Sequence, residues 1–434
     1  MSAVDVIELF LQYTALRGIV VLLAVLILAA LMRGAAAAKA QISIEEYREQ
    51  VMSRSLELMD SRLESDKLLS VSEKERTGFL PSLSADGSFT TDFRRSGDAD
   101  LWGFRVEPRI DQTIYAGGRV RAAYRQSLVN YEAALQREEQ MALDVRFSAD
   151  DAYWMLSAMQ LYKAATVEYV SLIRSLYDVV QERYHEGYVA KGDLLQVEAR
   201  LSDAEYSLIV SQNNYEVALH RFNNLRREVD TLGVVLTSSI VDSLAQPLRA
   251  SVDYIVERRP DVQEARRAIL SAEYGVKVAQ SAYNPSVSAG VSGSWQTYSP
   301  NAAGKTYLDG GLVVGVKVPI FHWRERRHAV ASSRRDVERK EVQLEQLYVQ
   351  ISREEADGWS ALVSSFSQMQ SSLKNVDIAS ENLSISNFSY QEGQATVLDV
   401  LQAQLSWIQI YTNAITARYN YAVAWSAYRR ITAE

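Results

Sequence analysis

Two aspartates, Asp193 and Asp399, combine a residue type and a spacing that favour a chemical role. Each lies six residues after the glycine of a Tyr-x-Glu-Gly motif, Gly187 or Gly393, and the two copies are 206 residues apart (399 − 193 = 206). A carboxylate at the start of a helix binds the free backbone amides of the first turn. We therefore expect each glycine to end one helix in a left-handed conformation and each aspartate to begin the next helix.

The other groups that could do chemistry lack the spacing that chemistry requires. The chain has no cysteine, and its histidines are not spaced as metal ligands: His185, His220, His322 and His328. No serine stands in a nucleophile elbow, and Gly117-Gly118 lacks the Lys-Ser/Thr that completes a phosphate loop. The formal charge of −8 gives no electrostatic reason to expect nucleic acid. The sequence therefore predicts no enzyme, no metal site, no cofactor and no nucleic-acid partner.

Apolar ladders with alternating spacings of three and four residues follow both glycine motifs. The first runs from Leu194 to Leu225 with a single break at Ser211, and the second runs from Val400 to Ile431. This spacing is typical of a coiled-coil helix. The stretch from Arg119 to Tyr184 is free of proline, and at ~1.5 Å per residue it would span roughly 100 Å as a helix. Each half of the chain is therefore predicted to form a long helical hairpin.

Two pairs of segments instead alternate apolar and polar residues, which is the period of a β-strand. They are long enough for the ~9–11 residues that cross an outer membrane at a tilt. One apolar and one polar face suits a barrel with lipid outside and water inside, although a soluble β-sandwich shows the same alternation. The residues expected to face lipid are Trp102, Phe104, Val106, Ile110, Val287, Val291, Val314 and Val316.

Four strands cannot close a barrel alone, because small barrels need about eight and lipid does not tolerate open sheet edges. Several copies must then complete the barrel together. Three copies would give about twelve strands, whereas two would give about eight with a lumen filled by side chains. The strand count leaves both assemblies open.

The N-terminus carries an apolar run from Gly18 to Met32, followed by small residues up to Ala40. At about 15 residues the run is shorter than the ~17–25 of a spanning helix. Small residues after such a run suit a signal-peptidase site. The sequence therefore predicts a cleaved signal peptide at 1–40, and a retained inner-membrane anchor is the alternative.

The predicted organisation is one architectural unit used twice. After the signal peptide, residues 41–228 form the first repeat, 229–251 a linker and 252–434 the second repeat. Each repeat has a helix, a β-hairpin and a long helical hairpin; the β-hairpins lie at about 82–115 and 285–321, and the helical turns at about 185–193 and 391–399.

Several motifs, taken in order, resemble the TolC-type outer-membrane efflux proteins over nearly all of the chain after the signal. They are Arg258-Arg259-Pro260-Asp261, Asn284-Pro285-Ser286-Val287, Val318-Pro319-Ile320-Phe321 and the duplicated Tyr-x-Glu-Gly turns. The resemblance implies an α+β membrane protein: a homotrimeric, twelve-stranded outer-membrane β-barrel continued by an α-helical coiled-coil barrel in the periplasm of a Gram-negative bacterium. It also implies a periplasmic adaptor (membrane fusion) protein and an inner-membrane pump of the RND, ABC or MFS type as partners.

The resemblance further implies two sites in the helical turns. The return helix of the second hairpin would line a periplasmic gate at Asp399 and Gln402, where the family often has a second acidic residue in place of the glutamine. The turns would dock the adaptor through Gly187, Asp193, Leu194, Gly393, Asp399 and Val400. A periplasmic coiled-coil adaptor or scaffold, anchored by the N-terminal segment, is the competing interpretation; it explains the helices but not the two alternating hairpins.

Overall fold

The structure is a computed structural model that describes residues 41–91, 93, 102–228, 234–240, 246–297 and 307–434. The predicted signal peptide and part of the predicted linker lie outside these residues. The chain divides into two compact units, and each takes residues from both halves of the sequence. The described residues of the first unit come from Met1–Ser53, Ala149–Ala245 and Gln368–Val423. Those of the second come from Arg54–Ser148, Gln246–Ser367 and Ala424–Glu434.

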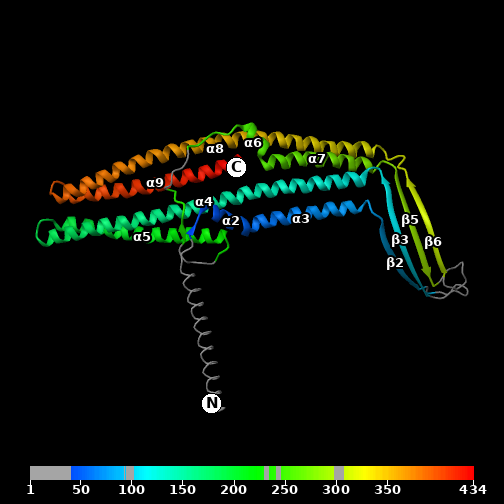
Figure 1. The fold of residues 1–434 in the computed structure, drawn as a ribbon, viewed down its shortest axis with the longest axis horizontal. Coiled ribbons are helices and arrows are strands. Elements are labelled where there is room, and N and C mark those ends of the chain that lie inside the picture. The colour runs from blue at the N-terminus through cyan, green and yellow to red at the C-terminus, as the bar shows by residue number, and fades with distance from the viewer. Residues whose placement is uncertain (1–40, 92, 94–101, 229–233, 241–245, 298–306) are drawn as a thin grey trace, which may run out of the picture. The chain divides into compact units, whose positions relative to one another are not determined.

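Four long helices dominate the fold, and they come in two matched pairs (Figure 1). Helix α4 (Arg119–His185) and helix α8 (Glu325–Gln391) have 67 residues each, while α5 (Lys191–Leu225) and α9 (Val397–Ile431) have 35 each. Every boundary of the second pair lies 206 residues after its counterpart in the first (325 − 119 = 206 and 431 − 225 = 206). The offset of the sequence motifs therefore extends over both complete helix pairs.

The two apolar ladders supply much of the core of the first unit, although Ala424, Tyr428 and Ile431 at the end of the second ladder belong to the second unit. None of the ladder residues is exposed, and Val197, Val400 and Trp407 belong to one cluster with residues of α4 and α8. Ser211, the break in the first ladder, is buried, but its hydroxyl donates a hydrogen bond to the carbonyl of Leu208 at 2.8 Å. A buried hydroxyl that has a partner costs little, so the break is tolerated.

A small parallel sheet also belongs to the first unit, and the sequence patterns did not predict it. Strand β1 (Gln41–Ile42) pairs with β4 (Val235–Leu236), which lies within the predicted linker. After β1, helix α2 (Ile44–Arg54) carries Tyr47, which stacks on Phe222 with ring centroids 3.9 Å apart. The Tyr47 hydroxyl donates to the Phe222 carbonyl at 2.9 Å, so α2 is fastened to the end of α5.

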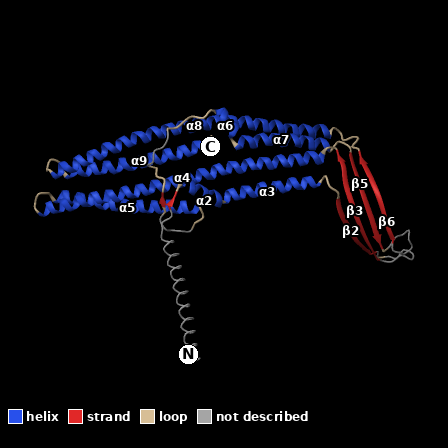
Figure 2. Cartoon of the chain, viewed as in Figure 1, coloured by secondary structure: helices blue, strands red, loops and turns tan. Residues whose placement is uncertain are grey.

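The second unit contains an antiparallel four-stranded sheet of order β2-β3-β5-β6 (Figure 2). Its strands are β2 (Ser82–Thr91), β3 (Trp102–Ala116), β5 (Ser286–Gln296) and β6 (Tyr307–Lys317). The two predicted hairpins are therefore neighbours in one sheet, and β2 and β6 are its two edges. An unbroken alternation would place Ile114 on the same face as Ile110, but a register shift between Thr113 and Tyr115 brings Tyr115 opposite Val287 instead.

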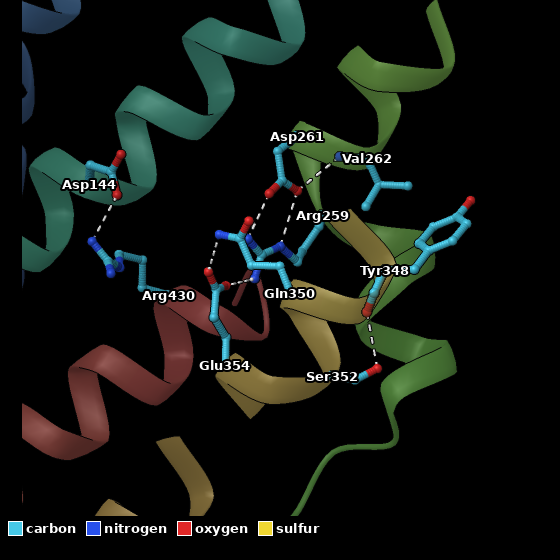
Figure 3. Close-up of polar contacts among 9 residues, drawn as sticks. All are labelled: Asp144, Arg259, Asp261, Val262, Tyr348, Gln350, Ser352, Glu354 and Arg430. Carbon is cyan, nitrogen blue, oxygen red and sulfur yellow. Dashed lines mark hydrogen bonds and ion pairs between the residues drawn. The ribbon is translucent and has the colours of Figure 1, made fainter. Parts of the chain in front are cut away.

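Three shorter helices complete the second unit: α3 (Leu56–Thr77), α6 (Val252–Arg258) and α7 (Pro260–Ser281). Pro260 begins α7, where its missing N–H and fixed φ are tolerated. The preceding Arg259 is buried and reaches two carboxylates (Figure 3). Its guanidinium donates to Asp261 at 2.6 and 3.0 Å and to Glu354 of α8 at 2.7 Å. The Arg-Pro-Asp motif thus joins α7 to α8 through a paired, buried charge. No helix in the described ranges has the length and apolar character that crossing a membrane requires.

A buried carboxylate in this unit, Glu355 of α8, gives a pH-dependent prediction. The side chain of Glu355 is 1% exposed and accepts two hydrogen bonds from Arg249 at 2.8 and 2.9 Å. The hydrogen bonds from Arg249 lower the pKa of Glu355 below its ordinary value of 4.5. A lowered pKa adds stability above the ordinary pKa, and this stability is lost as the pH falls through the folded-state pKa.

We therefore expect Glu355→Gln to lower the thermal unfolding midpoint at neutral pH by roughly 2–4 °C, and to flatten its decline in acid. Scanning calorimetry of the purified protein from about pH 7 to about pH 3 measures both effects. Glu345→Gln, at an exposed position of the same helix, is the matched control. Parallel pH profiles for the wild-type protein and Glu355→Gln would contradict the prediction.

Candidate functional site

The turns between the long helices end α4 and α8 in the same way (Figure 2). Gly187 has a φ of +81° and Gly393 a φ of +76°, so both glycines are left-handed, as expected. The residue after each glycine donates its backbone N–H to a carbonyl five residues earlier, at 2.9 Å after Gly187 and 2.8 Å after Gly393. These are Schellman helix ends, in which glycine adopts the left-handed conformation at little cost.

The two aspartates differ in what they bind. The Asp399 carboxylate accepts hydrogen bonds from the Thr396 backbone N–H at 2.8 Å and from the Thr396 hydroxyl at 2.7 Å. The hydroxyl accepts in turn from the Asp399 backbone N–H at 3.3 Å, which completes a reciprocal capping box. At the equivalent place before Asp193 stands Ala190, which has no side-chain oxygen and makes no cap. Both aspartates lie in the first turn of the return helix, as expected, and Asp399 also accepts a hydrogen bond from a backbone amide there.

The environment of Asp399 keeps it charged and accessible. The hydrogen bonds from the Thr396 hydroxyl, and then from its backbone N–H, lower the pKa of Asp399 below its ordinary value. Asp399 and Gln402 are both exposed, and they lie three residues apart on one side of α9, next to the buried Val400 and Ala403. The two predicted gate residues therefore share a free surface of the chain.

The residues predicted to dock an adaptor lie at different depths. Gly187 and Gly393 are exposed, Asp193 and Leu194 are half-buried, and Val400 is 0% exposed in the core. Val400 therefore supports the turn from inside, where a partner has no access to it.

Sequence reasoning missed three large apolar side chains that are exposed beside the turns. They are Tyr188, which is 79% exposed, Leu195 and Leu398. The sequence could have indicated these residues, because each follows a turn glycine directly or lies in the first turn of a return helix. An exposed apolar group in a turn is a candidate contact for another protein.

The two hairpins of the first unit are joined near their turns by Arg183 of α4. Its guanidinium donates to the carbonyls of Tyr390 and Gln391 at 3.4 Å each, at the end of α8. It also lies over the Tyr390 ring, 4.7 Å from the centroid. The positive charge is favourable beside the free carbonyls at a helix C-terminus. The motifs gave no sign of this contact, because Arg183 and Tyr390 are far apart in the sequence.

The sheet brings all of the predicted lipid-facing residues to one face. Ile110 pairs with Val291, and Val287 pairs with Val316; alternate residues of each strand share that side. Trp102, Phe104, Val106, Ile110, Val291, Val314 and Val316 are exposed there, and Val287 is half-buried. The chain by itself therefore leaves a largely apolar face uncovered.

The opposite face of the sheet is charged. It carries Arg105, Glu107, Arg109 and Asp111 along β3, with ion pairs of 3.2 Å between the first two and 2.7 Å between the last two. Exposed ion pairs add little stability, but they show that this face suits water. Across the described residues, no group of three or more His, Asp or Glu side chains could hold a metal ion.

Known proteins are similar to this chain in both sequence and fold. The family model for "Outer membrane efflux protein" matches residues 31–225 and 252–434. The probable efflux pump outer membrane protein TtgC of Pseudomonas putida KT2440 is 24% identical over 238 residues, covering 49% of this chain and 46% of TtgC. The chain thus spans about half the length of such relatives. The outer membrane protein TolC of Escherichia coli K12 is 20% identical over 382 residues, covering 85% of this chain and 77% of TolC. The crystal structure of CusC matches with a TM-score of 0.79 at 16% identity, covering 91% of this chain and 92% of CusC.

Proposed function

Because the chain belongs to the outer membrane efflux protein family, which is a family of transport channels located in the outer membrane, we propose that it is the channel-tunnel subunit of a tripartite export system. Its sheet would form part of a transmembrane barrel, and its long helices a periplasmic tunnel. One observation carries the proposal: a four-stranded sheet with one apolar and one charged face is continuous with paired helices of 67 and 35 residues. The alternative, a periplasmic scaffold, does not explain an exposed apolar face on that sheet.

The two open edges of the sheet support a trimer. β2 and β6 each present unpaired backbone groups, which lipid does not tolerate, so β2 of one copy would pair with β6 of the next. The charged face of β3 needs water, which favours the twelve strands of three copies over the filled lumen of eight. Large apolar side chains exposed on the long helices would be covered by the same neighbours: Tyr206, Ile209 and Val217 on α5, and Ile378, Ile385 and Phe388 on α8.

The mature protein is therefore expected to be a detergent-stable trimer in the outer-membrane fraction. Light scattering of the detergent-extracted protein measures the number of chains in the assembly. Density-gradient fractionation identifies the membrane in which the protein lies. A dimer would point to an eight-stranded barrel. A monomer, or sedimentation with the inner membrane, would favour the anchored scaffold and contradict the channel.

The duplicated organisation is part of the same proposal. Residues 41–228 and 252–434 would be two copies of one unit, and the constant offset of 206 residues between their helix boundaries supports this. Each repeat would contribute one strand pair and one helical hairpin. Three chains with two repeats each would then surround the tunnel with six similar helical hairpins. The segment before residue 41 would be the export signal.

The second hairpin is proposed to supply the periplasmic gate. Three copies of Asp399 around a threefold axis would form an acidic ring that attracts cations, with Gln402 one turn further along. The exposure of both side chains supports this role, and the hydrogen bonds from Thr396, which lower the pKa of Asp399 in the single chain, favour its charged form.

The capping box allows two roles of Asp399, the charge in the pore and the cap of α9, to be tested by different variants. Asp399→Asn removes the charge but keeps an oxygen that accepts from Thr396, whereas Thr396→Val removes the hydroxyl and keeps the charge. We expect Asp399→Asn to lower cation selectivity severalfold in single-channel recordings. We expect Thr396→Val to leave selectivity unchanged and to destabilise the turn by about 0.5–2 kcal/mol. Unchanged selectivity in Asp399→Asn would mean that Asp399 only caps the helix and is not part of the gate.

The turns at Gly187 and Gly393 are proposed to dock a periplasmic adaptor, coupled to an inner-membrane pump of the RND, ABC or MFS type. The exposed Tyr188, Leu195 and Leu398 would be the contacts, and the buried Val400 and half-buried Leu194 would hold the turns in shape. The name of TtgC as an efflux pump component supports this assignment.

A further inference from the structure

The segment between the last strand and α8 exposes an apolar and aromatic surface. The apolar series of β6 continues past its end in Val318 and Ile320, and Ile320 is 92% exposed. Phe321 and Trp323 follow, with ring centroids 4.9 Å apart, and Trp323 is 86% exposed. Aromatic side chains at the end of a membrane strand are typical of the layer where lipid tails meet headgroups.

A strongly basic cavity begins directly after this segment. It has a volume of about 720 Å³ and lies where the start of α8 meets Gln280 of α7, in the second unit. Its charged lining consists of five arginines and one glutamate: Arg324, Arg326, Arg327, Arg334, Arg335 and Glu338. Glu338 forms an ion pair with Arg335, so it offsets one of the five positive charges.

The remaining arginines have no partner within the described residues. Arg324, Arg326, Arg327 and Arg334 make no side-chain hydrogen bond or ion pair there, and the nearby carboxylate of Glu325 accepts instead from the Tyr283 hydroxyl at 2.9 Å. All four side chains are exposed, and together they concentrate positive charge around one cavity, which attracts an anion. A planar guanidinium binds the oxygens of a phosphate through two parallel hydrogen bonds.

The backbone holds the aromatic and basic parts together in an uncommon conformation. Trp323 and Arg324 have φ values of 41° and 67°, in the left-handed region that non-glycine residues rarely adopt. Two such residues in succession are strained, so the surrounding structure must hold them in place. The result is a sharp bend that sets the exposed Trp323 beside the arginine cavity.

We propose that this cavity binds the phosphate headgroup of an anionic phospholipid in the periplasmic leaflet, with the acyl chains lying against Ile320, Phe321 and Trp323. The inference rests on the proposed placement of the sheet in the outer membrane. A free phosphate shares the headgroup chemistry, but it would leave the adjoining apolar surface without a partner. The lipid satisfies both parts at once.

The test uses the mature trimer in detergent, titrated with phosphatidylglycerol or with phosphatidylcholine of the same acyl chains. Native mass spectrometry measures the lipid retained on each trimer. We expect phosphatidylglycerol to bind at least tenfold more tightly than phosphatidylcholine, because each basic residue near an anionic headgroup contributes about fivefold. The triple variant Arg324→Gln/Arg326→Gln/Arg327→Gln should lose this preference. The control Arg339→Gln/Lys340→Gln/Arg353→Gln removes the same charge further along α8 and should keep it.

Each outcome decides between sources of the anion. A preference that survives the triple variant, or that falls equally in the control, overturns the site. Displacement of phosphatidylglycerol by inorganic phosphate makes it a site for free anions, which also overturns the lipid. If the triple variant does not assemble, the single variants Arg326→Gln and Arg334→Gln are tested instead. Each should weaken phosphatidylglycerol binding severalfold. A wild-type trimer from the outer membrane without any lipid preference refutes this inference alone, whereas a wild-type protein that is not trimeric refutes the proposed function.

Discussion

Val291→Arg is expected to destabilise the membrane-inserted protein by about 2–4 kcal/mol, because it would place a charge near the middle of the face that we propose to be turned to lipid. Val291 is the sixth residue of β5 (Ser286–Gln296) and pairs with Ile110 on one side and Leu312 on the other. Both of its cross-strand partners are therefore apolar, and an arginine there would have to distort the barrel or the bilayer to reach water. Unfolding by urea in lipid vesicles measures the change.

Two matched variants make the result specific to the face and to depth. Ser288→Arg adds the same side chain to the same strand, but on the polar face between Thr113 and Gly315, and should cost little. Val316→Arg lies on the apolar face next to the last residue of β6, so its cost should fall to about 0–1 kcal/mol near the interface. Equal losses for Val291→Arg and Ser288→Arg would mean that the apolar face is not turned to lipid.

The parts of the fold that could be predicted from the sequence are those that a local period determines. Spacing of three and four residues identified the seams of α5 and α9, whose ladder residues are all shielded from solvent. Alternation identified the common face of β3, β5 and β6. It failed at Ile114, because a register shift adds a residue to one strand and reverses the phase beyond it.

Contacts between distant segments left no such period. β1 and β4 have two residues each, too few for any pattern, and their pairing joins Gln41 to Val235 across the chain. The contact from Arg183 to the end of α8 likewise depends on how the two hairpins pack. The difference between the two aspartates, in contrast, was written in the sequence. Thr396 stands three residues before Asp399 and completes a capping box, while Ala190 stands three before Asp193 and has no oxygen to offer.

Replacing both turn glycines, Gly187→Val/Gly393→Val, is expected to abolish export while leaving the trimer intact. A Cβ at either position would meet no atom within 4 Å, so steric collision is not the cause. The cost comes from the backbone, because left-handed φ values of +81° and +76° are strained by about 1–2 kcal/mol for a residue with a side chain, and a β-branched residue fits them worst. The proposed contacts between copies, at the sheet edges and along the long helices, would contain neither glycine, so assembly should persist.

The control for this double variant is Gly192→Val, five residues after Gly187. Gly192 lies in the first turn of α5, its φ is not left-handed, and an added Cβ there would also meet nothing within 4 Å. It should therefore retain export, apart from the small helix propensity of valine. Gly187→Asn/Gly393→Asn should recover part of the activity, since asparagine tolerates the left-handed region better than valine does. Export of a fluorescent substrate, scored beside trimer yield, measures all three. Full export by the valine pair would show that the shape of the turns does not matter for docking, and loss in Gly192→Val as well would mean that any bulk there blocks the partner.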